Sequence, residues 1–328
     1  MIRTIVQKKD WEEYLTLFKA SFLQSWDWGE VLTQSGQKIE RIVIENDSAT
    51  MLALIVFKRL PAKKTFAFIP FGPVTDKMNE NNWRELIGYI RSKGVVFLKI
   101  EPTNLVLVPE FVKQKMQAVK DVNPMATMVL PLEKDAADIL RSFHQKTRYN
   151  INLAEKKNLV IKWEKNFSAF WGLMKKTGSR DGFALHPEKN YQAAVENPSV
   201  KQVTIYFDDK PIAAGCFWIS QGTCYYLYGA SDHEYRQLMA PYLVQWEAVK
   251  MAKENGCRFY DFFGIAPRKE LGSKEYEYDP KHRYAGVTRF KLGFNGMVAE
   301  TPGTFDISIN GFWYKLYCLS RRLRGLQI

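Results

Sequence analysis

Hydrophobic and polar positions along the chain predict one series of elements twice. Each series has apolar strand-like runs, then a stretch with helical spacing that ends at a glycine, then a short apolar strand. The first series occupies residues 40–60, 63–74, 81–94 and 95–102, and the second occupies residues 201–220, 222–230, 240–256 and 257–267. Gly94 and Gly256 lie 162 positions apart, and Arg41 and Thr204 lie 163 apart. This spacing predicts a duplicated structural unit, although side-chain identity between the copies is low.

Helical segments are also expected before the strands of each copy. Helices, an antiparallel meander, a helix and a strand are typical of an α/β acyltransferase-like unit. The link between the copies falls in residues 129–135, where Pro131 breaks a strand and Asp135 can cap the next helix. The tail, 304–325, is expected to form a strand and a helix that return to complete the first unit.

Composition indicates a soluble globular protein with a basic surface. The chain has 328 residues, 46% of them apolar, and a net charge of +12. That charge favours a polyanionic partner, such as nucleic acid or an anionic membrane, although many basic proteins have neither. No apolar run is long enough to span a bilayer, and the N-terminus is too polar for a signal peptide. We therefore expect a cytoplasmic protein whose four cysteines are reduced.

The sequence lacks the usual marks of several enzyme classes. A glycine-rich turn that binds the pyrophosphate of coenzyme A is expected at residues 234–243, but this stretch has no glycine, and Met239 and Pro241 occupy it. The histidines have neither metal-ligand spacing nor the pattern of a catalytic triad; they are His144, His186, His233 and His282. We therefore expect no metal, and we regard coenzyme A as disfavoured.

Seven stretches in order resemble the FemABX family across nearly the whole chain. They are "SFLQSWDWGEVL" (21–32), "FIPFGPV" (68–74), "LKIEP" (98–102), "HQKTRYNINLAEKK" (144–157), "SRDGF" (179–183), "LMAPYLVQWEAVKMAKENGCRFYDFFGI" (238–265) and "AGVTRFKLGFNG" (285–296). The resemblance implies an α/β fold of two fused GNAT-like acyltransferase units with a cleft between them. The short connection from residue 182 to residue 190 leaves no room for the coiled-coil arm of longer members.

The resemblance also implies an activity and its partners. Members of this family are peptidyltransferases that take an amino acid from aminoacyl-tRNA and join it to a stem-peptide amine of a peptidoglycan precursor. We expect residues 1–131 plus 301–328 to bind the precursor, which is lipid II or UDP-MurNAc-pentapeptide, and residues 132–300 to bind aminoacyl-tRNA. We expect a monomer with no cofactor beyond the aminoacyl-tRNA co-substrate. The expected location is the cytoplasm, with peripheral contact at the inner face of the membrane left open.

Lys291, between Phe290 and Leu292, is the first catalytic candidate. A cation in a dry site can stabilise the oxyanion that forms when an amine attacks an ester. If this stretch is a strand, Lys291 points away from its apolar neighbours, and the alternative is an ordinary solvent-facing lysine. By analogy with the family, the backbone N–H of Phe290 is a second oxyanion donor.

Arg180 and Tyr242 match substrate-contacting positions of the family, and Glu101 ends a predicted buried strand where a carboxylate can hold the incoming amine. The predicted substrate-binding set is Trp28, Glu101, Arg180, Tyr242 and Tyr260. Each also has an ordinary structural interpretation: core packing for the three aromatic residues, a water-exposed strand end for Glu101, and pairing with Asp181 for Arg180.

A basic run is the candidate tRNA-binding surface. The run comprises Lys146, Arg148, Lys156, Lys157, Lys162 and Lys165, and the first four are the predicted tRNA-binding residues. The alternative is a solvated helix face. The end segment 312–326 is predicted to be a basic amphipathic helix that either packs on the first unit or contacts anionic lipid.

Two other functions remain open from the sequence. One is an acyl-CoA-dependent N-acyltransferase on the same scaffold. The other is a non-catalytic nucleic-acid-binding protein, for which the basic run suffices.

Overall fold

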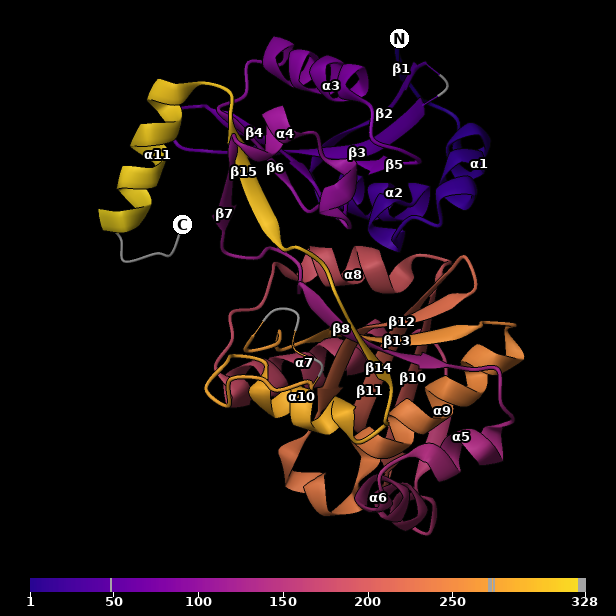
Figure 1. Cartoon of the computed structure of the whole chain (residues 1–328). Helices are drawn as coiled ribbons and strands as arrows, with labels where there is room; N and C mark the ends of the chain where they lie inside the picture. Colours follow the sequence, from indigo (N-terminus) through magenta and orange to yellow (C-terminus); the bar gives the residue numbers. More distant parts are fainter. Residues whose placement is uncertain (48, 271–272, 274, 324–328) are drawn as a thin grey trace. The chain divides into compact units, whose positions relative to one another are not determined.

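The structure is a computed structural model that describes residues 1–47, 49–270, 273 and 275–323. The chain is α/β and divides into two compact units (Figure 1). The first unit combines Met1–Met125 with the segment that begins at Thr301, and the second is Ala126–Glu300. No helix of the described residues is long and apolar enough to cross a membrane.

The first unit is built on a sheet with strand order β1-β2-β3-β4-β6-β15-β7, with β5 paired to β3. The strands are β1 (Ile2–Thr4), β2 (Lys38–Asn46), β3 (Ala49–Arg59), β4 (Thr65–Ile69), β5 (Val74–Thr75), β6 (Phe97–Ile100), β7 (Met116–Val119) and β15 (Thr304–Ser308). The helices are α1 (Lys8–Phe18), α2 (Trp26–Gln34), α3 (Glu80–Ser92), α4 (Glu110–Lys113) and α11 (Gly311–Leu323).

Strand β3 is apolar along most of its length because both of its faces are buried. Met51, Ala53 and Ile55 contribute to one hydrophobic cluster, and the alternate residues Leu52 and Leu54 contribute to another. The first cluster includes residues of α3, and the second includes residues of α1. A strand covered on both faces reads as a continuous apolar run rather than an alternating one.

The second unit is built on a sheet with strand order β14-β8-β13-β12-β11-β10-β9. The strands are β8 (Ala126–Pro131), β9 (Val160–Trp163), β10 (Val200–Phe207), β11 (Lys210–Ser220), β12 (Thr223–Ser231), β13 (Phe259–Ile265) and β14 (Met297–Glu300). The helices are α5 (Ala136–Ser142), α6 (Gln145–Glu155), α7 (Phe167–Asp181), α8 (Glu188–Glu196), α9 (Ala240–Glu254) and α10 (Ala285–Leu292). Asp135 caps α5 as predicted, by accepting from the backbone N–H of Asp138.

The two sheets confirm the duplicated order of elements. In the first unit, β2, β3 and β4 are followed by α3 and by β6, which is parallel to β4. In the second unit, β10, β11 and β12 are followed by α9 and by β13, which is parallel to β12. Gly94 and Gly256, just beyond the two helices, have φ of 68° and 70°, a conformation that glycine adopts without strain.

Each sheet contains a strand that lies between two strands distant from it in sequence or not adjacent to it in chain order. β15 lies between β6 and β7, so the tail completes the first sheet as predicted. β8 lies between β13 and β14 in the second sheet. The predicted boundary at residue 131 assigned β8 to the first unit; it pairs instead with the second sheet, where Met128 and Leu130 join the core. The predicted turn at residues 46–48 includes Ser48, which lies outside the described residues.

Candidate functional site

The candidate site of the second unit forms where its two parallel strands stop pairing. The β12–β13 register covers only Thr223 to Tyr225 against Phe259 to Asp261. Beyond that point the register of β13 with β8 shifts between Asp261 and Gly264, and Phe263 has a φ of 56°. This bulge turns backbone carbonyls of β13 toward α10.

Lys291 is located on α10 and is buried against this bulge. The strand considered for this stretch is not present, because residues 285–292 are helical. Lys291 is 5% exposed, and its Nζ donates to the carbonyl oxygens of Phe263 at 3.1 Å and Gly264 at 2.7 Å. Lys291 is therefore not a solvent-facing lysine. It also does not line the pocket that is described below.

Burial dominates the electrostatics around this lysine. It lowers the pKa of Lys291 to about 7, and the nearby carboxylate of Asp261 acts in the opposite direction. Burial also raises the pKa of Asp261, although hydrogen bonds from the Thr127 hydroxyl and the Phe263 N–H partly offset this. Burial therefore favours the neutral form of Lys291 relative to a lysine in water.

A pocket of about 200 Å³ lies next to α10. It is lined by residues of α7, of β11, of the end of β12, of the 3₁₀ segment η3 (His233–Leu238), of the start of α9, and of α10. The lining residues are Arg180, Ile212, Ser231, Asp232, His233, Tyr235, Arg236, Met239, Ala240, Pro241, Tyr242 and Phe290. Three predicted site residues, Arg180, Tyr242 and Phe290, are thus brought together.

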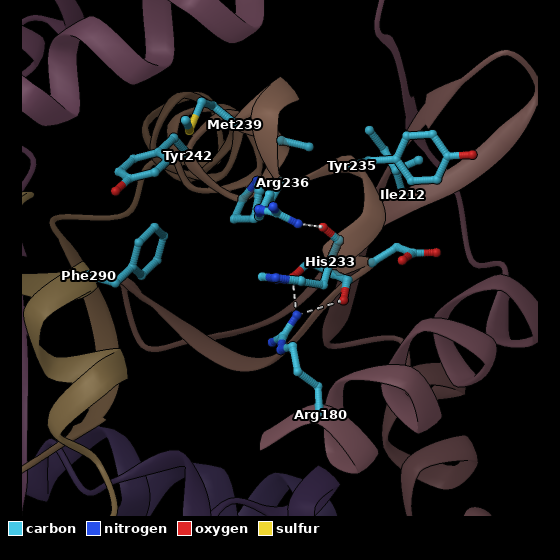
Figure 2. A pocket seen from close by; sticks show the side chains of 12 residues that line it. Arg180, Ile212, His233, Tyr235, Arg236, Met239, Tyr242 and Phe290 are labelled. Carbon is cyan, nitrogen blue, oxygen red and sulfur yellow. Dashed lines mark hydrogen bonds between the residues drawn. The ribbon is translucent and has the colours of Figure 1, made fainter. Parts of the chain in front are cut away.

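One side of the pocket is aromatic and another is cationic (Figure 2). The rings of Tyr242 and Phe290 meet edge to face with centroids 5.0 Å apart. Arg180 and Arg236 bring their guanidinium groups to the same pocket (Figure 2). An apolar wall with a few charged groups is typical of a site that orients a small ligand group.

Arg180 is held in place from two sides. Its guanidinium donates to both oxygens of Asp181, at 2.6 and 2.8 Å, and to the carbonyl of Ser231 at 3.2 Å. The hydrogen bond to Asp181 raises the pKa of Arg180, so its charge is fixed. Arg180 therefore pairs with Asp181 and lines the pocket at the same time. The structural interpretation of this residue does not exclude the functional one.

Asp232 is a charged group of the pocket that the sequence did not single out. Burial alone favours its neutral form, but the ammonium of Lys176 at 2.5 Å and the N–H of Glu234 at 3.1 Å hold the pKa of Asp232 below its usual value. His233 and Arg236 were also missed. Asp232 caps an irregular 3₁₀ segment after β12, and His233 and Arg236 lie within it; hydrophobic periodicity gives no signal in such a segment.

The backbone at the start of α9 offers little to an anion. Pro241 has no N–H, and the N–H of Tyr242 donates to the carbonyl of Met239 at 3.0 Å. This agrees with the absence of a pyrophosphate-binding turn. The charge available to an anionic ligand here comes from side chains.

The N–H of Phe290 belongs to a helix. Phe290 is the sixth residue of α10, where a regular helix uses each N–H for the carbonyl four residues earlier. The oxyanion role of this N–H therefore stays a prediction. It is the side chain of Phe290 that lines the pocket.

The other predicted substrate-binding residues make packing or hydrogen-bond contacts within the protein and do not line the pocket. Tyr260 is fully buried, and its hydroxyl donates to Gln245 at 2.7 Å. In the first unit, Trp28 packs edge to face on Phe22 with centroids 5.4 Å apart. Glu101, also in the first unit, is 3% exposed rather than water-exposed at a strand end.

The predicted tRNA-binding residues differ among themselves. Lys146, Lys156 and Lys157 are exposed on or just after α6. Arg148 instead donates to the carbonyls of Arg141 and Phe143, so it fastens α6 to the end of α5. Three of the four therefore remain available on the surface.

Comparison with known proteins identifies the family. The model of the FemAB family matches residues 6–120 and 199–322, which is more than half of the chain. The chain belongs to the FemAB family. Curated relatives include the lipid II:glycine glycyltransferases of Staphylococcus saprophyticus and Staphylococcus aureus, which are 24% and 22% identical. These matches cover 91% and 90% of this chain, and 90% and 89% of those proteins.

Solved structures agree on the fold. A crystal structure of FemX has a TM-score of 0.78 at 19% identity, covering 96% of this chain and 99% of that one. A tandem GNAT protein from the clavulanic acid biosynthesis pathway has a TM-score of 0.53 at 8% identity, covering 94% and 99%. The prediction of two fused GNAT-like units is confirmed.

This chain has fewer residues than the relative from Staphylococcus saprophyticus has in the region where the two align. The alignment with the Staphylococcus saprophyticus protein spans 384 positions, more than the 328 residues of this chain, so that relative has residues where this chain has none. In the structure, α7 ends at Asp181 and α8 begins at Glu188. No long arm separates these two helices.

Proposed function

We propose that this protein transfers an amino acid from aminoacyl-tRNA to a stem-peptide amine of a peptidoglycan precursor, and so builds a cross-bridge. The observation that carries the proposal is the glycyltransferase activity for which the curated relatives are named, since these relatives match about nine-tenths of the chain. Their name also favours a lipid-linked precursor.

The reaction needs positioning and charge stabilisation more than a nucleophilic side chain. The acceptor amine attacks the ester carbonyl, a C–N bond forms, and the ester C–O bond breaks. The proton that leaves the amine ends on the ribose hydroxyl. No oxidant or covalent enzyme intermediate is required, because the aminoacyl ester is already activated.

The pocket of the second unit is our candidate for the reacting end of the donor. Tyr242 and Phe290 provide an apolar wall that excludes water, and Arg180 and Arg236 suit a phosphate or a developing oxyanion. The exposed lysines at 146, 156 and 157 are candidates for contacts with tRNA phosphates.

Lys291 keeps a candidate role in stabilising negative charge. Its ammonium has three N–H donors, and the carbonyls of Phe263 and Gly264 accept two of them. In this proposal the third donates to the oxyanion when the ester carbonyl reaches the bulge of β13, beyond the pocket, which Lys291 does not line. In a dry environment such a hydrogen bond is worth more than in water.

An acyl-CoA-dependent N-acyltransferase is the second candidate, because the tandem GNAT fold is shared with acyltransferases. The start of α9 weighs against it, since two of its first three residues offer no free N–H to a pyrophosphate.

A transfer assay separates the candidates. Purified full-length protein is given tRNA charged with a mixture of radiolabelled amino acids, and either lipid-linked or UDP-linked muramyl pentapeptide. Acetyl-CoA with the same acceptors serves as the rival donor. We expect label on the lipid-linked precursor and none from acetyl-CoA. Acetyl transfer without aminoacyl transfer would overturn the proposal.

Variants at Lys291 test its role in the same assay. Lys291→Met is expected to lower kcat about 10²-fold with little change in KM, because the charge acts in the transition state. Lys291→Arg keeps a cation and is expected to retain more activity. A loss explained by unfolding would appear as a lowered melting temperature in Lys291→Met.

A further inference from the structure

Helix α11 carries an exposed apolar stripe on one side. Its members are Phe312, Leu316, Leu319 and Leu323, which are 68%, 42%, 53% and 80% exposed. At about 100° per residue, their spacing places all four within an arc of about 60° on the helix surface. Isolated exposed leucines are common, but a continuous stripe of four is the pattern of a surface that another apolar phase covers.

The opposite face of α11 is fastened to the first unit. Tyr314 is 4% exposed, and its hydroxyl donates to Asp306 of β15 at 3.2 Å. Its ring packs on that of Phe97 with centroids 5.3 Å apart. Because α11 packs on the first unit through Tyr314, the apolar stripe on its opposite face points to solvent.

Cations border the stripe. Lys315 and Arg322 are exposed and lie, at about 100° per residue, on the same flank of the stripe, about 60° to 80° from Phe312. α11 contains no Asp or Glu. An apolar face that is flanked by cations and has no acidic residues complements a surface with an apolar interior and anionic groups at its boundary with water.

We propose that α11 is a docking surface for an anionic lipid bilayer. The helix lies in the plane of the interface, with its stripe among the acyl chains and Lys315 and Arg322 among the lipid phosphates. This goes beyond the proposed function, since the binding is measurable with vesicles that contain no precursor. A protein partner fits the charge pattern less well, because it requires an acidic rim around an apolar groove.

Vesicle flotation tests the proposal with the full-length protein. The probes are vesicles of phosphatidylcholine alone and of phosphatidylcholine mixed with phosphatidylglycerol. We expect binding to the mixed vesicles, weaker binding to phosphatidylcholine, and a decrease as salt is raised. The double variant Leu316→Gln/Leu319→Gln is expected to lower the partition coefficient about tenfold or more.

Matched controls separate the stripe from general effects. Leu17→Gln/Val106→Gln changes two side chains of the first unit that are 74% and 75% exposed, and it should bind as the wild type does. Lys315→Glu/Arg322→Glu should weaken binding at least about fivefold per cation. Melting temperatures of the stripe variants should change little, because about half of each substituted residue is already exposed to water.

Three results would overturn the proposal. The wild type could fail to bind phosphatidylglycerol vesicles, or the control pair could lose binding as much as the stripe pair does. The wild type could also form a dimer that Leu316→Gln/Leu319→Gln separates, without any vesicle binding. The stripe would then be covered by a second copy of the chain.

Discussion

At the scale of single residues, Lys291 is the clearest case of a polar group held in an apolar place. Its ammonium is satisfied by two backbone carbonyls, yet burial lowers its pKa to about 7. The unfolded chain returns the group to water, where its pKa is about 10.5. Between these values the unfolded state binds more protons, so raising the pH favours the folded state.

This difference predicts a pH-dependent stability that Lys291→Met removes. From pH 7.5 to pH 9.5, the free energy of unfolding of the wild type should rise by up to about 1.4 kcal/mol per pH unit from this group. Urea unfolding of both proteins at several pH values measures the difference in slope, since the other groups titrate alike in both. Equal slopes would show that Lys291 is not buried as described.

Glu101 carries a second prediction at this scale. Its carboxylate accepts from Asn123 N at 2.9 Å, Asn123 Nδ2 at 2.7 Å, Thr304 Oγ1 at 3.0 Å and Phe71 N at 3.3 Å. Glu101→Gln places an amide NH₂ among these donors, so we expect the free energy of unfolding to fall by about 1–3 kcal/mol.

Glu110→Gln, at an exposed carboxylate of the same unit, is the control and should change stability little. Chemical denaturation provides the measurement. If Glu101→Gln left stability intact but abolished transfer, the predicted contact with substrate would replace the structural interpretation.

At the scale of elements, the duplicated strands and helices were predictable and α10 was not. Strands such as β3 and helices such as α3 bury apolar faces, so their periodicity is visible in the sequence. In α10 the buried residues are Thr288 and Lys291. The Thr288 hydroxyl accepts from Ala266 N and donates to Tyr284 O, so the helix packs through polar groups on an irregular strand end. A rule that looks for apolar faces cannot find such a helix.

The place of β15 gives a prediction for the first unit. β15 is the only link between β6 and β7 in the described sheet order. A chain ending at residue 300 leaves the edges of both strands unpaired, and we expect its first unit to lose cooperative unfolding. A chain ending at residue 310 keeps β15 and loses α11, so it should fold with lower stability.

Hydrogen exchange of the β6 amides distinguishes these two truncations. Protection should vanish in the shorter chain and persist, at a lower level, in the longer one. Equal protection in both chains would mean that β15 contributes little to the first sheet.

At the scale of the whole molecule, the two units differ in whether they are formed by one segment of the chain or by two. The second unit is one continuous segment, and its main hydrophobic cluster draws only on residues from 126 to 298. Residues 126–300 expressed alone are therefore expected to unfold cooperatively in urea and to retain a near-ultraviolet circular dichroism signal. A non-cooperative transition without that signal would show that the unit depends on the rest of the chain.

The charge of the whole molecule leads to the last prediction. A net charge of +12 attracts any polyanion, so a specific tRNA surface must be distinguished from general attraction. Reversing Lys146, Lys156 and Lys157 to Glu removes the exposed part of the predicted surface. Reversing Lys19, Lys63 and Lys120, which are exposed in the first unit, changes the net charge by the same amount.

If α6 and its end bind tRNA phosphates, the first set should raise Kd far more than the second does. It should also reduce the slope of log Kd against log salt by roughly one for each phosphate that a lysine no longer neutralises. Filter binding over a range of salt concentrations measures both quantities. Equal effects from the two sets would mean that tRNA responds to the charge of the whole molecule, and the reacting end of the donor would then have to be guided by the pocket at Arg180 and Arg236 alone.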